Sequence, residues 1–117
     1  MLLYALLVFL VGACGGLVLA SFVLRGRFAP WAVSLLHALL GATGIVLLIV
    51  AVMLDNLGAL PLVALGLFLI TAMLGFFLAS LHFDQKVALK KYVLTHASFA
   101  VTSVIVLVVA VLQHLRP

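Results

Sequence analysis

Four long segments of this chain carry no formal charge, and this pattern restricts the fold more than any other feature. The segments cover residues 2–24, 31–54, 58–81 and 92–112. Each is long enough to cross a hydrocarbon layer of about 30 Å as a helix. A helix satisfies its own backbone hydrogen bonds, which lipid cannot do. We therefore predict an all-α membrane protein with four transmembrane helices.

Composition supports lipid as the solvent for most side chains. The chain has 117 residues, of which 69% are hydrophobic and 7% charged, with a mean hydropathy of +1.58. A soluble domain of this length could not hide so much apolar surface, because small domains keep most residues near water. A transmembrane β-barrel would need alternating polar and apolar residues, and the run IVLLIV at 45–50 does not alternate. The length fits a single domain over residues 1–117.

The distribution of basic residues predicts the orientation in the membrane. Five cations are assigned to the first and third connections: Arg25, Arg27, Lys86, Lys90 and Lys91. The middle connection, residues 55–58, contains no base. The positive-inside rule then places the first and third connections in the cytoplasm and both termini outside, as in a bacterial inner membrane. Anionic lipid headgroups account for this basic surplus, so no nucleic-acid partner is expected.

The first segment is expected to stay in the protein. It lacks the basic start of a signal peptide, and its apolar run is too long for one. Cys14 is the only cysteine, which excludes an intrachain disulfide. A lone cysteine in an apolar helix is expected to serve as a small packing residue.

The second half of the sequence matches the first, with no gap, when His37 is aligned with His96. We call this alignment the repeat register. The matches cover both helices of each half and include His, Thr, Ser, Gly and Phe, which apolar composition alone does not align in one register. They pair Phe9, Ala13, Gly16, Ser21, His37 and Thr43 with Phe68, Ala72, Gly75, Ser80, His96 and Thr102. We predict two tandem hairpin repeats, residues 1–58 and 59–117. Because each repeat crosses twice, the repeats are parallel, related by an axis along the membrane normal.

The repeat predicts an antiparallel four-helix bundle with helices one and three on one diagonal and helices two and four on the other. Small residues follow a helical spacing and are expected to face inward. The first helix carries Ala5, Phe9, Ala13, Gly16 and Ala20, which the third repeats. The second helix carries His37, Gly41, Gly44, Leu48 and Ala51, and the fourth His96, Ala100, Ser103, Leu107 and Ala110. Tight helix packing alone would also explain these residues.

No aspartate or glutamate lies within a predicted crossing. This absence disfavours small multidrug transporters that use a membrane carboxylate, and also carboxylate-bridged di-iron sites. A single cysteine disfavours a quinone-linked disulfide enzyme. No glycine-rich phosphate loop or nucleophile elbow is present. The chain therefore has no catalytic constellation of its own.

His37 and His96 are the strongest candidate functional residues. They are equivalent under the repeat, and His37 lies seven residues past Pro30, or roughly 10 Å into its helix. Ionisable groups at such depth are costly without a partner and are functional candidates. On diagonal helices the two imidazoles would face each other across the bundle axis. Two neutral imidazoles can coordinate a metal through their ring nitrogens.

Heme b is the metal group that such a pair suits best. A zinc site needs three or four protein ligands, and no other donor is near. Heme iron needs only two axial ligands. Small residues beside the histidines would leave a flat slot: Gly16, Gly41, Gly44, Gly75, Ala100 and Ser103. Arg25, Arg27, Lys90 and Lys91 lie near the same leaflet and could pair with the heme propionates.

With its diagonal histidines at HALLGATG (37–44) and HASFAVTS (96–103), the chain resembles small four-helix bacterial membrane proteins and membrane b-type cytochromes. The resemblance implies a one-electron carrier or a heme-bearing subunit of a larger oxidoreductase, with a quinone as partner. Many such cytochromes hold two hemes. Here the outer leaflet offers only His114, and the residue that corresponds to it in the first repeat is Asp55, not a histidine. A second bis-histidine site is therefore not expected.

Two other functions stay open. The first is a heme-free structural or assembly subunit, in which each histidine bonds to a carbonyl or hydroxyl group. The second is a small transporter or channel that works as an oligomer. His82, at the end of the third helix, is expected to be interfacial and is a candidate extra ligand or proton relay. Trp31, Tyr92 and Tyr4 are expected to anchor the interface. Thr43 and Thr102 are expected to bond to their own helices.

Overall fold

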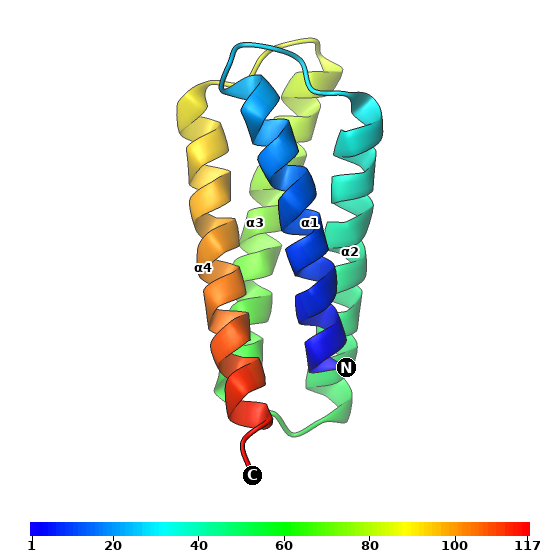
Figure 1. The fold of residues 1–117 in the computed structure, drawn as a ribbon, viewed down its shortest axis with the longest axis vertical. Coiled ribbons are helices and arrows are strands. Elements are labelled where there is room, and N and C mark those ends of the chain that lie inside the picture. The colour runs from blue at the N-terminus through cyan, green and yellow to red at the C-terminus, as the bar shows by residue number, and fades with distance from the viewer.

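The computed structural model describes residues 1–117 as four antiparallel helices (Figure 1). They are α1 (Leu2–Val23), α2 (Trp31–Leu54), α3 (Ala59–Phe83) and α4 (Lys90–His114). The bundle measures 48 × 22 × 19 Å. All four helices are long and apolar enough to cross a membrane, as the sequence predicts, and the chain is consistent with an integral membrane protein.

Proline and glycine lie before two of the helices and in the first connection, and no side chain caps a helix start. Pro30 precedes α2 in an extended conformation, with φ −60° and ψ 131°. Gly58 precedes α3 at φ 75°, and Gly26 lies at φ 72° in the first connection. Glycine adopts this left-handed region at no steric cost, which lets the chain reverse within a few residues. The middle connection is therefore short, and it brings α2 and α3 side by side.

Three helix boundaries differ from the sequence prediction by two residues, including the end of α4, which lies at His114 rather than at residue 112. Helix α3 continues to Phe83, and α4 begins at Lys90 rather than at Tyr92. The assignment of Lys90 and Lys91 to the third connection is therefore wrong, because both lie in the first turn of α4. The predicted segments stop at the first charged residue. A helix can continue through lysines, because their long side chains carry the charge to the membrane interface.

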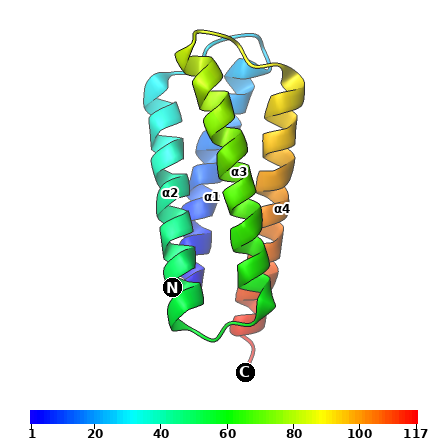
Figure 2. The same cartoon turned by 180° about the vertical axis from the view of Figure 1, so that it is seen from behind.

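Each helix packs against its two neighbours, and the diagonal pairs are α1 with α3 and α2 with α4, as expected. Packing is closest within the hairpins α1–α2 and α3–α4. Both hairpin connections lie at one end of the bundle, the upper end in Figure 1, which we call the basic end. The middle connection and both chain termini lie at the other end, the terminal end (Figure 2).

The apolar core occupies the half of the bundle toward the terminal end. Its members come from the first turns of α1 and α3 and the last turns of α2 and α4: Leu2, Ala5, Leu6, Phe9, Leu48, Ala51, Ala64, Phe68, Leu107, Ala110 and Val111. Phe9 and Phe68 stack across the bundle axis with ring centroids 3.6 Å apart and an interplanar angle of 4°. Both histidines expected to face the axis lie on the other side of this stack, toward the basic end.

The small-residue stripe of α1 is only partly inward. Phe9 and Gly12 are buried, whereas Ala13 and Cys14 are exposed on the outer face of the bundle. Successive steps of four residues rotate around a helix by about 40° each, so the stripe leaves the core face at Ala13. Steps of three and four, through Gly12 to Gly16, keep to it. Cys14 therefore does not pack inside the bundle.

Candidate functional site

His37 is fixed by a hydrogen bond inside the first hairpin. Its Nδ1 lies 2.9 Å from the carbonyl oxygen of Gly12 on α1. A carbonyl only accepts, so Nδ1 carries the proton and donates it. In the neutral ring this leaves Nε2 as a lone-pair donor. Metal-ligating histidines are oriented by a bond of this kind.

His96 makes the corresponding bond inside the second hairpin. Its Nδ1 donates to the carbonyl oxygen of Thr71 on α3 at 3.0 Å. Donor and acceptor are again 25 residues apart, and both correspond to those of the first hairpin in the repeat register. Two independent side chains thus show the same tautomer and the same anchoring.

The two imidazoles meet across the bundle axis. Their ring centroids are 6.2 Å apart, with an interplanar angle of 76°. Neither Nε2 atom has a hydrogen-bond partner. Every fully buried polar side-chain atom in the structure has one, so both Nε2 atoms are partly exposed. The bundle therefore brings together two half-buried nitrogen lone pairs from opposite helices.

Glycines let the histidine rings lie against the backbones of α1 and α3. A Cβ atom at Gly16 would meet Cε1 of His37 at 3.1 Å, and one at Gly75 would meet Cε1 of His96 at 3.1 Å. Contacts this short would push the rings away. The two glycines therefore set how closely each imidazole approaches its neighbouring helix, at the same place in both hairpins.

The other predicted slot residues have different surroundings. Gly41 lies one turn beyond His37, and a Cβ atom there would meet nothing within 4 Å. Ala100, its counterpart on α4, is half-buried. A Cβ atom at Gly44 would lie 2.7 Å from the Phe9 ring. Gly44 therefore seats Phe9 rather than contacting the histidines.

Ser103, the counterpart of Gly44, is fully buried, and its hydroxyl lies near two other oxygen atoms. Its hydroxyl lies 2.6 Å from the carbonyl oxygen of Phe99, to which it donates, and 3.3 Å from the hydroxyl of Thr71. Thr71 donates its own proton to the carbonyl oxygen of Leu67. Because each hydroxyl has one proton, a bond between the two hydroxyls forms only in place of one of these backbone bonds. The sequence did not single out Thr71, although it stands where hairpin one has Gly12. The sequence did contain a signal for this pair, because Thr71 and Ser103 are hydroxyl residues at two positions where the first hairpin has glycine.

The predicted propionate-pairing cations all lie at the basic end, and two of them contact nearby groups. Arg25 donates from Nε to the carbonyl oxygen of Ser21 and lies over the Phe22 ring at 5.6 Å. Lys91 lies over the Tyr92 ring at 5.1 Å. Arg27 and Lys90 are exposed. The structure shows no contact of these cations with His37 or His96.

His82 joins the end of α3 to the start of α2. Its ring stacks on Trp31 with centroids 4.0 Å apart at 13°, and Phe28 lies 5.9 Å away. Its Nδ1 is 3.3 Å from the hydroxyl of Ser34. Its contacts are with Trp31, Phe28 and Ser34 rather than with His37 or His96. Trp31, which the sequence predicts to be an interface anchor, thus also packs against His82.

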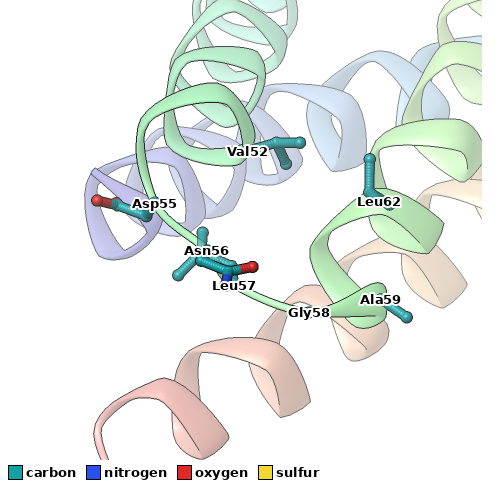
Figure 3. Close-up of a pocket in the computed structure, with 7 residues that line it drawn as sticks. All are labelled: Val52, Asp55, Asn56, Leu57, Gly58, Ala59 and Leu62. Atoms are coloured by element: carbon teal, nitrogen blue, oxygen red, sulfur yellow. The ribbon is translucent and has the colours of Figure 1, made fainter.

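The terminal end holds features that belong to no histidine pair. His114 is exposed, as expected. A shallow pocket follows the middle connection and is lined by Val52, Asp55, Asn56, Leu57, Gly58, Ala59 and Leu62 (Figure 3). It lies at the opposite end of α2 from His37. Thr43 and Thr102 bond to carbonyls of their own helices, as predicted.

Fold and site together define a four-helix bundle of membrane-spanning character with two opposed imidazoles at its axis. No group of three or more His, Cys, Asp or Glu side chains is placed to hold a metal ion. The arrangement therefore offers two nitrogen ligands and no more. Comparison with protein-family models, with curated proteins and with solved structures finds no match for this chain.

Proposed function

We propose that this chain is a small membrane cytochrome of the b type, in which His37 and His96 are the axial ligands of one heme. The observation that carries the proposal is the pair of imidazoles 6.2 Å apart across the axis, each with Nδ1 donated to a carbonyl. This leaves both Nε2 atoms free to bind a metal. A two-ligand site suits heme because the macrocycle supplies the other four donors.

The separation of the rings supports ligation of one metal atom. When two imidazoles bind one metal atom from opposite sides, each metal–nitrogen bond is about 2 Å long. Adding the distance from each nitrogen to the centre of its ring gives a centroid separation of about 6 Å. The observed centroid distance is 6.2 Å. The separation of the two rings thus matches the spacing that ligation of one metal atom requires.

The macrocycle would lie where small residues surround the histidines. Gly16 and Gly75 border the rings on α1 and α3, and Gly41 faces open space on α2. Ala100 completes this set on α4. Propionates directed toward the basic end would approach Arg25, Arg27, Lys90 and Lys91, and guanidinium and ammonium groups pair well with carboxylates.

Heme bound in this way supplies one-electron oxidation and reduction. The chain itself would set the potential through its ligands, its apolar surroundings and the nearby positive charge. In this proposal the hairpins are tandem repeats, and the basic end lies in the cytoplasm of a bacterial inner membrane. A quinol and a larger oxidoreductase are the proposed electron partners, and self-association remains compatible with the bundle.

An absorbance spectrum of the purified protein tests the proposal. Oxidised and dithionite-reduced samples are compared for the wild type, His37→Ala and His96→Ala, with His114→Ala as a matched control. We expect a sharp reduced α-band and near-stoichiometric heme in the wild type and control, both lost in the two axial variants. No Soret band after expression with added heme would overturn the proposal.

A heme-free structural subunit is the second candidate, and one observation favours it. The bonds from His37 to Gly12 and from His96 to Thr71 join neighbouring helices in each hairpin, with or without a cofactor. Such bonds contribute about 0.6 kcal/mol on average inside membranes. Retention of a larger membrane partner after mild solubilisation, without heme, would support this candidate.

A further inference from the structure

The two hairpins meet along two seams, and these seams are joined differently. One seam lies between α2 and α3, and the other between α1 and α4. The connection of residues 55–58 joins α2 to α3 at the terminal end. Helices α1 and α4 are not consecutive in the chain, so no short connection of this kind joins them. The α1–α4 seam therefore depends on side-chain contacts alone.

At the basic end, only the α2–α3 seam has a polar and aromatic clasp. His82 stacks on Trp31 at 4.0 Å, and its Nδ1 lies 3.3 Å from the Ser34 hydroxyl. This is the only side-chain hydrogen bond between the two hairpins. The clasp and the short connection close this seam at both ends.

The α1–α4 seam has no equivalent clasp. In the repeat register, His82, Trp31 and Ser34 correspond to Val23, Lys90 and Val93. No side-chain hydrogen bond, aromatic stack or cation–π contact joins α1 to α4. Near the basic end, Val93 is the one buried apolar residue of α4. The other buried apolar residues of these two helices lie toward the terminal end: Leu2, Ala5, Leu6 and Phe9 of α1, and Leu107, Ala110 and Val111 of α4.

We infer that the α1–α4 seam opens at the basic end and is the entrance through which a planar, apolar ligand reaches His37 and His96 from the lipid. The clasp at His82 keeps the α2–α3 seam shut, so the hairpins swing apart on one side only. The identity of the ligand rests on the proposed function, whereas the one-sided opening does not.

Pulsed electron paramagnetic resonance on spin-label pairs tests the opening without any heme. In a Cys14→Ala background, one pair is placed at Leu24 and Tyr92 across α1–α4. The other pair, at the corresponding positions of the repeat register, is placed at Phe83 and Val33 across α2–α3. We expect a broad distance distribution for the first pair and a narrow one for the second. Equal widths would overturn the inference.

The variant His82→Val tests the clasp, because valine is the residue at the matched position in α1. We expect it to broaden the α2–α3 distribution to the width of the α1–α4 distribution. His114→Val is the control, since that histidine is exposed at the other end. An unchanged α2–α3 distribution in His82→Val would show that the clasp does not hold the seam.

Disulfide locks then test the route of the ligand. A Val23→Cys/Val93→Cys pair closes the proposed entrance, and a Ser34→Cys/His82→Cys pair locks the opposite seam. With hemin as the probe, we expect the first lock to abolish uptake on the time scale of the unlocked protein and the second to leave it unchanged. Equal slowing by both locks would overturn the route. No binding by any form, with one-sided opening retained, would contradict the heme proposal instead.

Discussion

The two hairpins anchor a histidine in the same way but fill the space beneath it differently. In α1–α2, Gly12 and Gly44 have no side chain, and the Phe9 ring occupies the space over Gly44. In α3–α4, Thr71 and Ser103 stand at the matched positions and contact each other through their hydroxyls. One hairpin is thus packed by an aromatic ring and the other by a polar pair.

This difference shows which features the histidines require. The bond from Nδ1 to a backbone carbonyl does not depend on the acceptor's side chain, and it is found with Gly12 and with Thr71. A glycine beside the ring is present in both hairpins. The layer between the histidines and the apolar core can vary, provided that its volume is filled. Substitutions in that layer should therefore affect the hairpins unequally, and substitutions beside the rings equally.

The largest expected effect comes from Gly44→Ala, which would break the packing of the first hairpin. The new Cβ atom would lie 2.7 to 2.9 Å from three atoms of the Phe9 ring. That ring cannot retreat freely, because it is stacked on Phe68 at 3.6 Å. We expect the free energy of unfolding, measured by denaturant titration in detergent or bicelles, to fall by about 1–3 kcal/mol.

Gly41→Ala is the matched control for Gly44→Ala. It lies three residues earlier on the same helix, and its Cβ atom would meet nothing within 4 Å. Alanine favours a helix over glycine by about 0.5–1 kcal/mol, so this variant should be as stable as the wild type or more stable. Equal losses in the two variants would show that Phe9 does not occupy the space over Gly44.

A smaller and symmetric effect is expected from Gly16→Ala and Gly75→Ala. Each new Cβ atom would lie 3.1 Å from Cε1 of its histidine, and the ring is held by its carbonyl bond. We expect each variant to lower the free energy of unfolding by about 1 kcal/mol. A clear loss in one variant and none in the other would contradict the view that both hairpins hold their histidine alike.

The smallest expected effect concerns the hydroxyl pair of the second hairpin. A double-mutant cycle of Thr71→Val and Ser103→Ala isolates the contact between the two hydroxyls, which are 3.3 Å apart. We expect a coupling energy of about 0.6 kcal/mol, the average for polar contacts between membrane helices. Zero coupling would mean that each hydroxyl acts only through its bond to its own helix, to Leu67 or to Phe99.

The number of helices and most of their boundaries could be predicted from the sequence. Long charge-free segments can satisfy their backbone in lipid only as helices, so composition and segment length suffice for this inference. The charge rule placed the start of α4 too late at Tyr92, because lysines interrupt apolar composition but not the helix. The sequence also identified His37 and His96 as a pair, because they occupy the same position in the two matching halves.

The surroundings of that pair could not be predicted, because they depend on how the four helices pack. The acceptors Gly12 and Thr71 offer backbone oxygens, and a backbone oxygen leaves no mark on residue type. Likewise, Gly44 and Gly16 look alike in the sequence, yet one seats Phe9 and the other His37. The clasp of His82 with Trp31 joins residues far apart in the chain. Such contacts depend on how the helices rotate and pack, which the hydrophobic pattern of a membrane helix specifies poorly because lipid and core are equally apolar.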